Sequence, residues 1–259
     1  MKSIVCLALA CLLTMLAAEK GVAADEQSLL GKPGKLLLED DFSRTEMAPK
    51  WKIGMGFFTI KDGVVTAAEN PADKHGAYAY VDPHFPYKDF VAGFSVKFDG
   101  GKSCSFRMDD TDYQGSHAGH IIRATITPTS VQLDDSKFGS MKTDLYEKMK
   151  DPSTTAEEKK QVQAAMKARA ASFKVDLDLA KWHQARVEVV GDEMLLSIDG
   201  KPVGYLQSEG VDHPTKNAVG FTIGGQSVQL DNVRVWEATA APSWAIHRPE
   251  VLGSMQKIP

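Results

Sequence analysis

Short apolar runs, separated by turn-forming residues, extend over most of the chain beyond residue 25. In many of them apolar and polar residues alternate, which is typical of a strand with one face in a core. Asp62-Gly63 and Asp199-Gly200 lie between such runs and indicate tight β-hairpins. This pattern predicts an all-β fold, a two-sheet antiparallel jelly-roll sandwich. The expected strands cover residues 36–42, 57–60, 64–67, 77–81, 90–98, 103–108, 120–127, 130–133, 185–190, 194–198, 203–206, 218–223 and 228–236.

One internal segment, residues 141–172, breaks the β pattern of the sandwich domain, which we expect to span residues 25–237. Asp151-Pro152-Ser153-Thr154-Thr155 separates two helical pieces, and Thr155-Ala156-Glu157-Glu158 has the spacing of a capping box. We therefore expect an inserted helical hairpin, which is either a lid over a site or a solvated insertion on a loop. Residues 238–259 form a weakly patterned C-terminal tail, which is expected to wrap the surface or to be disordered.

The first 24 residues are expected to be a secretory signal peptide. Lys2 supplies a positive charge, residues 4–18 are almost all apolar, and Val22-Ala23-Ala24 places small residues before a cut at Asp25. The apolar run is shorter than the roughly 20 residues of a membrane span, which argues against a retained anchor. A lipoprotein cut at Cys11 would leave too short an apolar region. No other stretch is suited to cross a bilayer, so we expect a secreted or periplasmic protein.

Composition narrows the partners further. Of the three cysteines, only Cys104 lies beyond the signal peptide, so the mature chain cannot form an internal disulfide. The net charge of the whole chain is −4, and the loss of Lys2, Lys20 and Glu19 makes it −5. A mildly acidic protein of this kind is not expected to bind nucleic acid, whereas the charge is compatible with a carbohydrate partner.

Candidate chemistry is concentrated in residues 107–123, RMDDTDYQGSHAGHIIR. If the two strands that flank this loop pair, Arg107, Asp109 and Arg123 share the face that points away from the core. His117 and His120 lie at the exit of the loop and can lean over that face. These five residues form the predicted catalytic cluster: histidine moves protons, arginine stabilises an oxyanion, and aspartate orients a histidine or acts as a base. The alternative is an exposed ion pair beside histidines that merely decorate a turn.

Aromatic side chains before this loop are candidates for stacking against sugar rings. Tyr78 and Tyr80 are the predicted substrate-binding residues, with His75 at the rim beside them. Trp51 and Tyr87 are further candidates. Because aromatic residues of β proteins more often pack in the core or at an edge, each of them has that alternative role.

Several familiar catalytic motifs are missing from the sequence. It contains no G-x-S-x-G, no P-loop, no C-x-x-C pair and no H-E-x-x-H. It also lacks the E-x-D-x-x-E strand with which jelly-roll glycosidases of the laminarinase type place two carboxylates on one face. Hydrolysis by that pair of carboxylates is therefore not expected.

Several strands together resemble those of 3-keto-disaccharide hydrolase-like domains, which are secreted concanavalin-like jelly rolls of planctomycete-type bacteria. The resemblance covers most of residues 36–237 and implies a concanavalin-like fold and hydrolase or lyase activity on (3-keto-)glycosides. Its motifs are mainly structural. They are WKI at 51–53, FTIKDGVV at 58–65, WHQARVEV at 182–189, the hairpin at 195–203, GFTI at 220–223 and LDNVRV at 230–235.

The middle of the chain departs from the family pattern. The strand written G-N-S-G-I-F-L-R in the family is only loosely matched by residues 101–107, and the Y-E-x-Q-I-x-D strand is replaced by residues 120–127. Of the family's site residues, Arg107 alone transfers. The resemblance also implies a structural calcium, as in related jelly rolls, with Asp41 and Asp231 at the matching positions. The alternative is that Asp231 is a turn residue or an ion-pair partner.

Two classes of function follow. The first is an enzyme that hydrolyses or eliminates at a modified glycoside through the residue 107–123 cluster. The second is a non-catalytic carbohydrate-binding or structural cell-envelope protein on the same scaffold, because a fold does not by itself fix a function.

Overall fold

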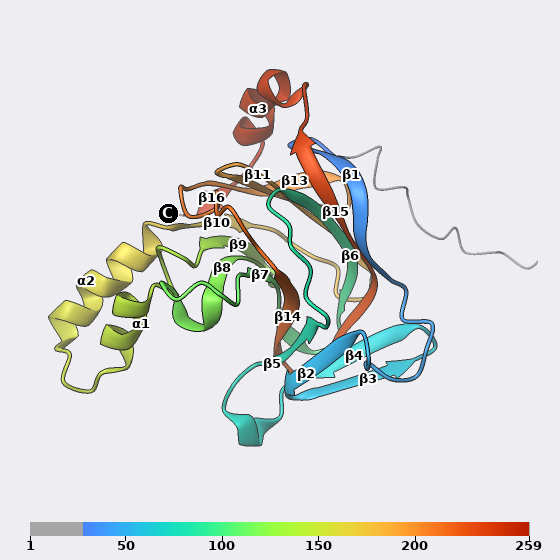
Figure 1. Cartoon of the computed structure of the whole chain (residues 1–259), viewed down its shortest axis with the longest axis horizontal. Helices are drawn as coiled ribbons and strands as arrows, with labels where there is room; N and C mark the ends of the chain where they lie inside the picture. The colour runs from blue at the N-terminus through green and yellow to red at the C-terminus, as the bar shows by residue number, and fades with distance from the viewer. Residues whose placement is uncertain (1–27, 259) are drawn as a thin grey trace, which may run out of the picture.

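The computed structural model describes residues 28–258, so the predicted signal peptide lies outside the described residues. Within this range the chain forms two antiparallel eight-stranded sheets packed as a sandwich, as the alternating pattern predicts (Figure 1). Sheet A contains, in spatial order, β13 (Lys201–Gln207), β12 (Glu193–Ile198), β11 (His183–Val190), β6 (Phe90–Phe98), β15 (Val228–Ala240), β4 (Val64–Ala68) and β3 (Phe57–Lys61), with β1 (Gly31–Asp40) paired to β15. Sheet B contains β16 (Lys257–Ile258), β10 (Ala170–Lys174), β9 (Ser130–Asp135), β8 (His120–Ile126), β7 (Gly101–Asp109), β14 (Ala218–Gly225), β5 (Ala77–Val81) and β2 (Trp51–Met55).

The core lies between the two sheets, and strand β7 shows how the sequence builds it. Cys104, Phe106 and Met108 occupy alternate positions and are completely buried, as predicted. The ring of Phe106 lies 5.5 Å from that of Phe94, which belongs to sheet A. Burying large apolar side chains is the dominant favourable term in folding. The sandwich therefore has a continuous core that holds its two sheets together without a disulfide.

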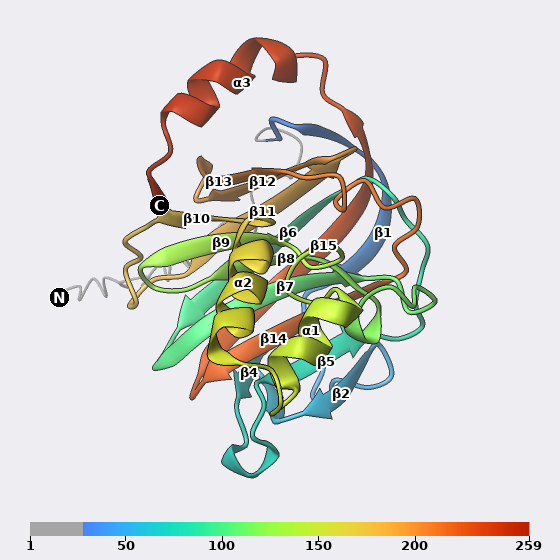
Figure 2. The ribbon, with the colours of Figure 1, turned by 90° about the vertical axis from the view of Figure 1, so that its left-hand side faces the viewer.

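The predicted helical hairpin is present as α1 (Thr143–Lys150) and α2 (Ala156–Lys167), between β9 and β10. Its capping box forms as expected, because the Thr155 and Glu158 side chains each accept a hydrogen bond from the other residue's N–H. Residues 170–172 belong to β10, so the insertion ends earlier than the predicted residue 172. Both helices stand over the outer face of sheet B (Figure 2).

The C-terminal tail is more regular than its sequence suggests. β15 continues to Ala240, helix α3 (Trp244–Gly253) follows, and β16 then pairs with β10, so α3 connects sheet A to sheet B (Figures 1 and 2). Trp244 anchors the helix, because its ring is buried and its Nε1 donates to the carboxylate of Glu193. Of the two alternatives expected for the tail, wrapping of the surface and disorder, the structure therefore favours the first for residues 238–258. No helix within the described range is both long and apolar enough to span a membrane.

Candidate functional site

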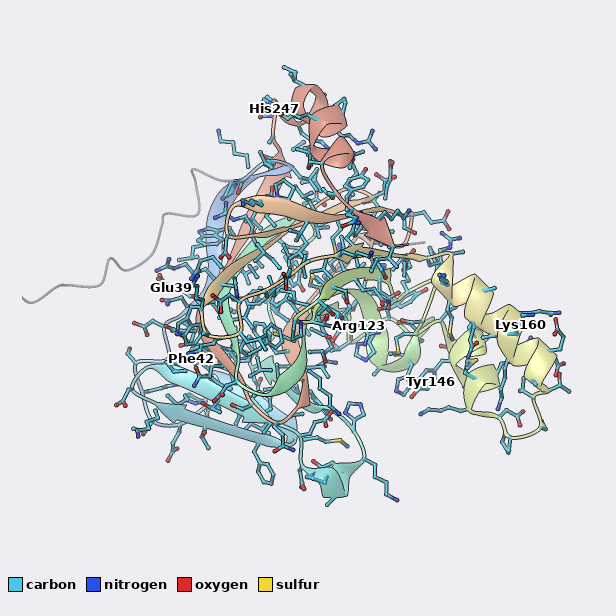
Figure 3. The ribbon with its side chains drawn as sticks, turned by 180° about the vertical axis from the view of Figure 1, so that it is seen from behind. Glu39, Phe42, Arg123, Tyr146, Lys160 and His247 are labelled. Atoms are coloured by element: carbon cyan, nitrogen blue, oxygen red, sulfur yellow. The ribbon has the colours of Figure 1, made fainter. Side chains whose placement is uncertain are left out.

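A cleft of about 660 Å³ opens on the outer face of sheet B, between the sheet and helix α1. Its volume is within the range of about 300–1,000 Å³ that is common for ligand pockets. Figure 3 shows Arg123 of β8 and Tyr146 of α1 on this side of the molecule, whereas His247 of α3 lies apart from them at the top of the view. The structure brings all eight residues of the predicted catalytic and substrate-binding sets to this cleft: Arg107, Asp109, His117, His120, Arg123, His75, Tyr78 and Tyr80.

Asp109, at the end of β7, is held between a histidine and an arginine. Its Oδ1 lies 2.7 Å from Nδ1 of His120, and its Oδ2 lies 3.6 Å from Nη1 of Arg107. The three side chains are largely buried, with exposures of 11%, 16% and 13% for Asp109, His120 and Arg107. A carboxylate on Nδ1 fixes the orientation of the imidazole ring, so that Nε2 is the nitrogen that exchanges a proton with a ligand.

Pairing of the two strands creates this arrangement. β7 and β8 are antiparallel neighbours in which Arg107 lies opposite Arg123 and Asp109 lies opposite His120. The carboxylate of Asp134 on β9 lies 3.1 Å from Arg123 and balances its charge. Two adjacent arginines on one face are tolerated because each has its own carboxylate within reach.

The loop between β7 and β8 positions His117 through tight backbone contacts. The Asp110 N–H donates to the Gly119 carbonyl at 2.8 Å. Gly119 has a φ of +70°, and a Cβ there would lie 2.0 Å from the Asp110 oxygen, so this position requires glycine. The His117 N–H donates to the Met141 carbonyl at 2.7 Å, just before α1. The loop and the helical insertion are therefore joined directly at the cleft.

His117 also contacts the insertion through its side chain. Its ring stacks on Tyr146 of α1, with the ring centroids 4.0 Å apart and the planes inclined by 16°. Burial lowers the pKa of His117, and the positive charges of His120, Lys150 and His75 lower it further. The imidazole is therefore neutral near pH 7. Because α1 lines the cleft, the insertion is part of the site and not merely a solvated loop.

The opposite wall of the cleft is aromatic. Tyr78 and Tyr80 point outwards from β5, whose intervening residues are buried in the core. The guanidinium of Arg107 lies 5.4 Å from the Tyr78 ring centroid, and His75 meets the same ring edge-on at 5.6 Å. His84 lies 5.8 Å from Tyr80. This wall offers flat apolar surface beside polar nitrogen atoms, which suits a sugar ring with its apolar face and its hydroxyl groups.

The other two aromatic candidates do not reach the cleft. Trp51 and Tyr87 are 2% and 5% exposed and belong to the core. The Trp51 Nε1 donates to Asp40 at 2.7 Å, and the Tyr87 hydroxyl donates to the Ala218 carbonyl at 2.9 Å. Each has a structural partner inside the protein, so of the two roles left open for them, packing in the core is the one that the structure shows.

Sequence reasoning missed five polar residues that line the cleft: His84, Thr111, Tyr146, Lys150 and Thr222. His84 follows the end of β5 closely, so the strand pattern that predicts Tyr78 and Tyr80 as binding residues could have included it. Tyr146 and Lys150 lie one helical turn apart on α1, so their spacing places them on one face. That spacing gives no indication of which part of the sandwich the face covers.

The two predicted calcium ligands lie outside the cleft. Asp41 and Asp231 both accept hydrogen bonds from residues one or two positions further along the chain. Calcium takes roughly six to eight oxygen ligands. Among residues 28–258, no group of three or more histidine, cysteine or acidic side chains is arranged to hold a metal ion. The fit is therefore poor. The hollow that contains Asp41 is also lined by Glu39 and Asp40, but these carboxylates pair with the cationic residues Arg234 and Arg44 in the same hollow.

Comparison with known families identifies the fold and the lineage. Residues 34–236 match the sequence profile of the 3-keto-alpha-glucoside-1,2-lyase-like domain, and this range includes every residue that lines the cleft. The chain belongs to this family. The resemblance seen in the sequence motifs is thereby confirmed. No curated protein matches the sequence significantly.

Solved structures with the same fold include both carbohydrate-cleaving enzymes and a protein of unassigned function. An endo-beta-1,3-glucanase from Pyrococcus furiosus has a TM-score of 0.53 at 11% identity, over 80% of this chain and 95% of that one. A GlcNAcα1-4Gal-releasing endo-β-galactosidase from Clostridium perfringens has a TM-score of 0.54 at 9% identity, over 83% and 65%. A galectin-like protein of unknown function from Bacillus subtilis has a TM-score of 0.51 at 13% identity, over 82% and 100%. At these identities the likeness establishes the jelly-roll fold alone.

Proposed function

We propose that the protein binds a glycoside in the cleft and cleaves it by elimination beside a ketone at C3 of the sugar. The observation that supports this best is the Asp109–His120 pair, a buried carboxylate that orients a histidine in a pocket of suitable size. Among the described residues that line the cleft, Asp109 is the one carboxylate. Glycoside hydrolysis by two opposed carboxylates therefore has no second member here.

The chemistry needs one base and one stabiliser of negative charge. A ketone at C3 makes the C2 proton acidic, because its removal gives an enolate. His120 takes this proton through Nε2, and Arg107 stabilises the charge on the enolate oxygen. The C1–C2 double bond then forms as the bond from C1 to the leaving oxygen breaks, and that oxygen takes the proton from the His120 imidazolium. The products are an unsaturated keto sugar and a free alcohol, and no water is consumed.

The aromatic wall supports a second candidate function, a non-catalytic glycan-binding module. Tyr78 and Tyr80 would stack on a sugar ring whether or not a bond is broken. In that case the histidines would only donate hydrogen bonds to sugar hydroxyls and accept hydrogen bonds from them. The two functions share one ligand class and differ in turnover.

The test uses a 3-keto-disaccharide and the plain disaccharide from which it is made. Elimination yields a conjugated ketone, whose absorbance and NMR signals report turnover. We expect turnover of the keto sugar and a loss of at least about a hundredfold in His120→Ala, with a fall in melting temperature no larger than loss of the hydrogen bond to Asp109 explains. The matched control is His247→Ala, an exposed histidine on α3 far from the cleft. Binding of either sugar without turnover would establish the module and refute elimination, and neither binding nor turnover would refute both.

We also propose that the protein is exported, with residues 1–24 removed. A charged start, an apolar run and small residues before Asp25 support this. Mass spectrometry of the protein recovered from expressing cells measures the mature N-terminus. A chain that keeps its first 24 residues in the cytoplasm would contradict export.

A further inference from the structure

The charge of the cleft is opposite in sign to that of the protein. The whole chain carries a net charge of −4. Three cationic side chains line the cleft, Arg107, Arg123 and Lys150, against the single carboxylate of Asp109. A cleft lined by one sign of charge concentrates ligands of the other sign, because its low-dielectric walls focus the field. Stabilisation of the enolate uses Arg107, so Arg123 and Lys150 are the cations that the elimination of a neutral sugar does not require.

The three cations differ in how well they are neutralised. Arg107 faces Asp109 across 3.6 Å, and Arg123 lies 3.1 Å from Asp134. Lys150 forms no ion pair with any carboxylate of residues 28–258, although it is an exposed residue that lines the same cleft. It is therefore the cation of this cleft whose charge is left for a ligand.

Contacts within helix α1 hold the Lys150 ammonium in place. Its Nζ lies 4.2 Å from the centroid of the Tyr146 ring, one turn earlier in the helix. Tyr146 is fixed in turn by its stacking on His117. A cation over an aromatic ring keeps its position at little cost in solvation. Lysines are also common near the C-terminal end of a helix, because their positive charge interacts favourably with the negative end of the helix dipole. Lys148 in the same last turn serves that role without lining the cleft.

A second observation also indicates a ligand with acceptor oxygens. The Nε of Arg107 is buried and has no hydrogen-bond partner among the described residues. Buried donors are almost always satisfied, so an unpaired guanidinium nitrogen beside a cleft is unusual. Asp109 therefore does not use all the donor groups of Arg107, which leaves Arg107 for the reacting sugar and Lys150 for a different part of the same ligand.

We infer that the glycoside bound in this cleft carries an anionic substituent, a carboxylate or a sulfate, which Lys150 holds at the rim while Arg107 and His120 contact the reacting sugar. This inference rests on the proposed function. It goes beyond that function by specifying the class of glycan, an acidic one.

The experiment compares three disaccharides by titration calorimetry with the folded protein: cellobiose, cellobiouronic acid with a glucuronic acid in place of the non-reducing glucose, and cellobiose sulfated on C6 of that residue. We expect at least one acidic disaccharide to bind about fivefold more tightly than cellobiose, the scale of a partly exposed ion pair. The uronic acid and the sulfate ester distinguish the two sources of charge. Lys150→Gln should abolish the preference, whereas the matched control Lys148→Gln should retain it, because Lys148 lies on the same helix outside the cleft.

Salt provides a test that needs no variant. Raising ionic strength from about 0.02 M to 0.5 M shortens the Debye length several-fold and should weaken binding of the acidic sugar alone. Equal affinity for cellobiose and both acidic sugars would overturn the inference but leave the proposed function intact. A preference that survives Lys150→Gln would also overturn it. Failure of all three sugars to bind, with no turnover of the keto sugar, would refute the proposed function itself.

Discussion

Replacement of Asp109 by asparagine tests the proposed mechanism most directly. Asparagine has almost the same shape, so the cleft keeps its form. Its amide oxygen can still accept the hydrogen bond from Nδ1 of His120. In the unaltered protein this nitrogen lies 2.7 Å from Oδ1 of Asp109. The negative charge is lost, however, and the amide nitrogen turns towards Arg107, where a carboxylate oxygen lay at 3.6 Å. His120 then has no charged partner to stabilise its imidazolium.

The size of the effect follows from these contacts. A hydrogen bond to a charged group contributes about 1.5–3 kcal/mol, so the free energy of unfolding should fall by about that amount or less. For a domain of this size 1 kcal/mol corresponds to about 2–4 °C in melting temperature. Loss of the carboxylate that orients a catalytic histidine lowers kcat by about 10²–10⁴, or about 3–5 kcal/mol of transition-state stabilisation. The loss of activity should thus exceed the loss of stability.

The assay is steady-state elimination of the 3-keto-disaccharide, with Asp112→Asn as the control, an exposed carboxylate in the same loop. We expect kcat to fall while KM changes little. If Asp109 acts through His120, the double variant Asp109→Asn, His120→Ala should be no worse than His120→Ala alone. A kcat for Asp109→Asn equal to that of Asp112→Asn would refute the assigned role. Additive losses in the double variant would show that Asp109 acts independently of His120.

Three further predictions concern the rest of the molecule. Because the residues around Asp41 and Asp231 fit calcium poorly, a chelator should leave the melting temperature unchanged, and a lower value would restore the predicted calcium site. Glu188→Ala should cost at least about 2 kcal/mol in denaturant titrations, since this buried carboxylate accepts three backbone N–H groups at the start of β1, and the exposed control Glu237→Ala should cost under about 0.5 kcal/mol. Burial lowers the pKa of His213, so the unfolded chain takes up its proton first and stability should fall as pH drops below about 6.5. His213→Gln should reduce this loss between pH 7.5 and pH 5.5, and an unchanged pH profile would disprove it.

Most of the sandwich was predictable because each strand shows its own alternation of apolar and polar residues. In β7 this alternation assigns Phe106 to the core and Arg107 to the outer face, and the structure agrees. The start of β8 shows the limit of the argument. A register irregularity beside Asp109 lets His120 face the cleft while both Ile121 and Ile122 are buried. Strict alternation cannot describe this, because the irregularity depends on the partner strand and not on the sequence of β8 itself.

The cleft was predictable where its residues are close in sequence, and less so where they are distant. Arg107, Asp109 and His120 fall within one strand–loop–strand unit, so their proximity follows from a single pairing. Tyr146 joins them through the hydrogen bond from the His117 N–H to the carbonyl before α1 and through ring stacking. Neither contact has a signature in the sequence, because backbone groups and aromatic rings can pair with many partners.

The division of the cleft between sheet and insertion has a consequence for how the protein would select its ligand. The groups assigned to chemistry, Arg107, Asp109 and His120, lie on or beside paired strands of sheet B, where the hydrogen-bonded ladder restricts their movement. The groups assigned to recognition, Tyr146 and Lys150, lie on an inserted helix whose sequence can change without disturbing the sandwich. Substitutions on α1 should therefore change KM and the preference among sugars, whereas substitutions on the strands should change kcat. In this way the members of a family with one scaffold can retain one reaction while they differ in the glycans that they bind.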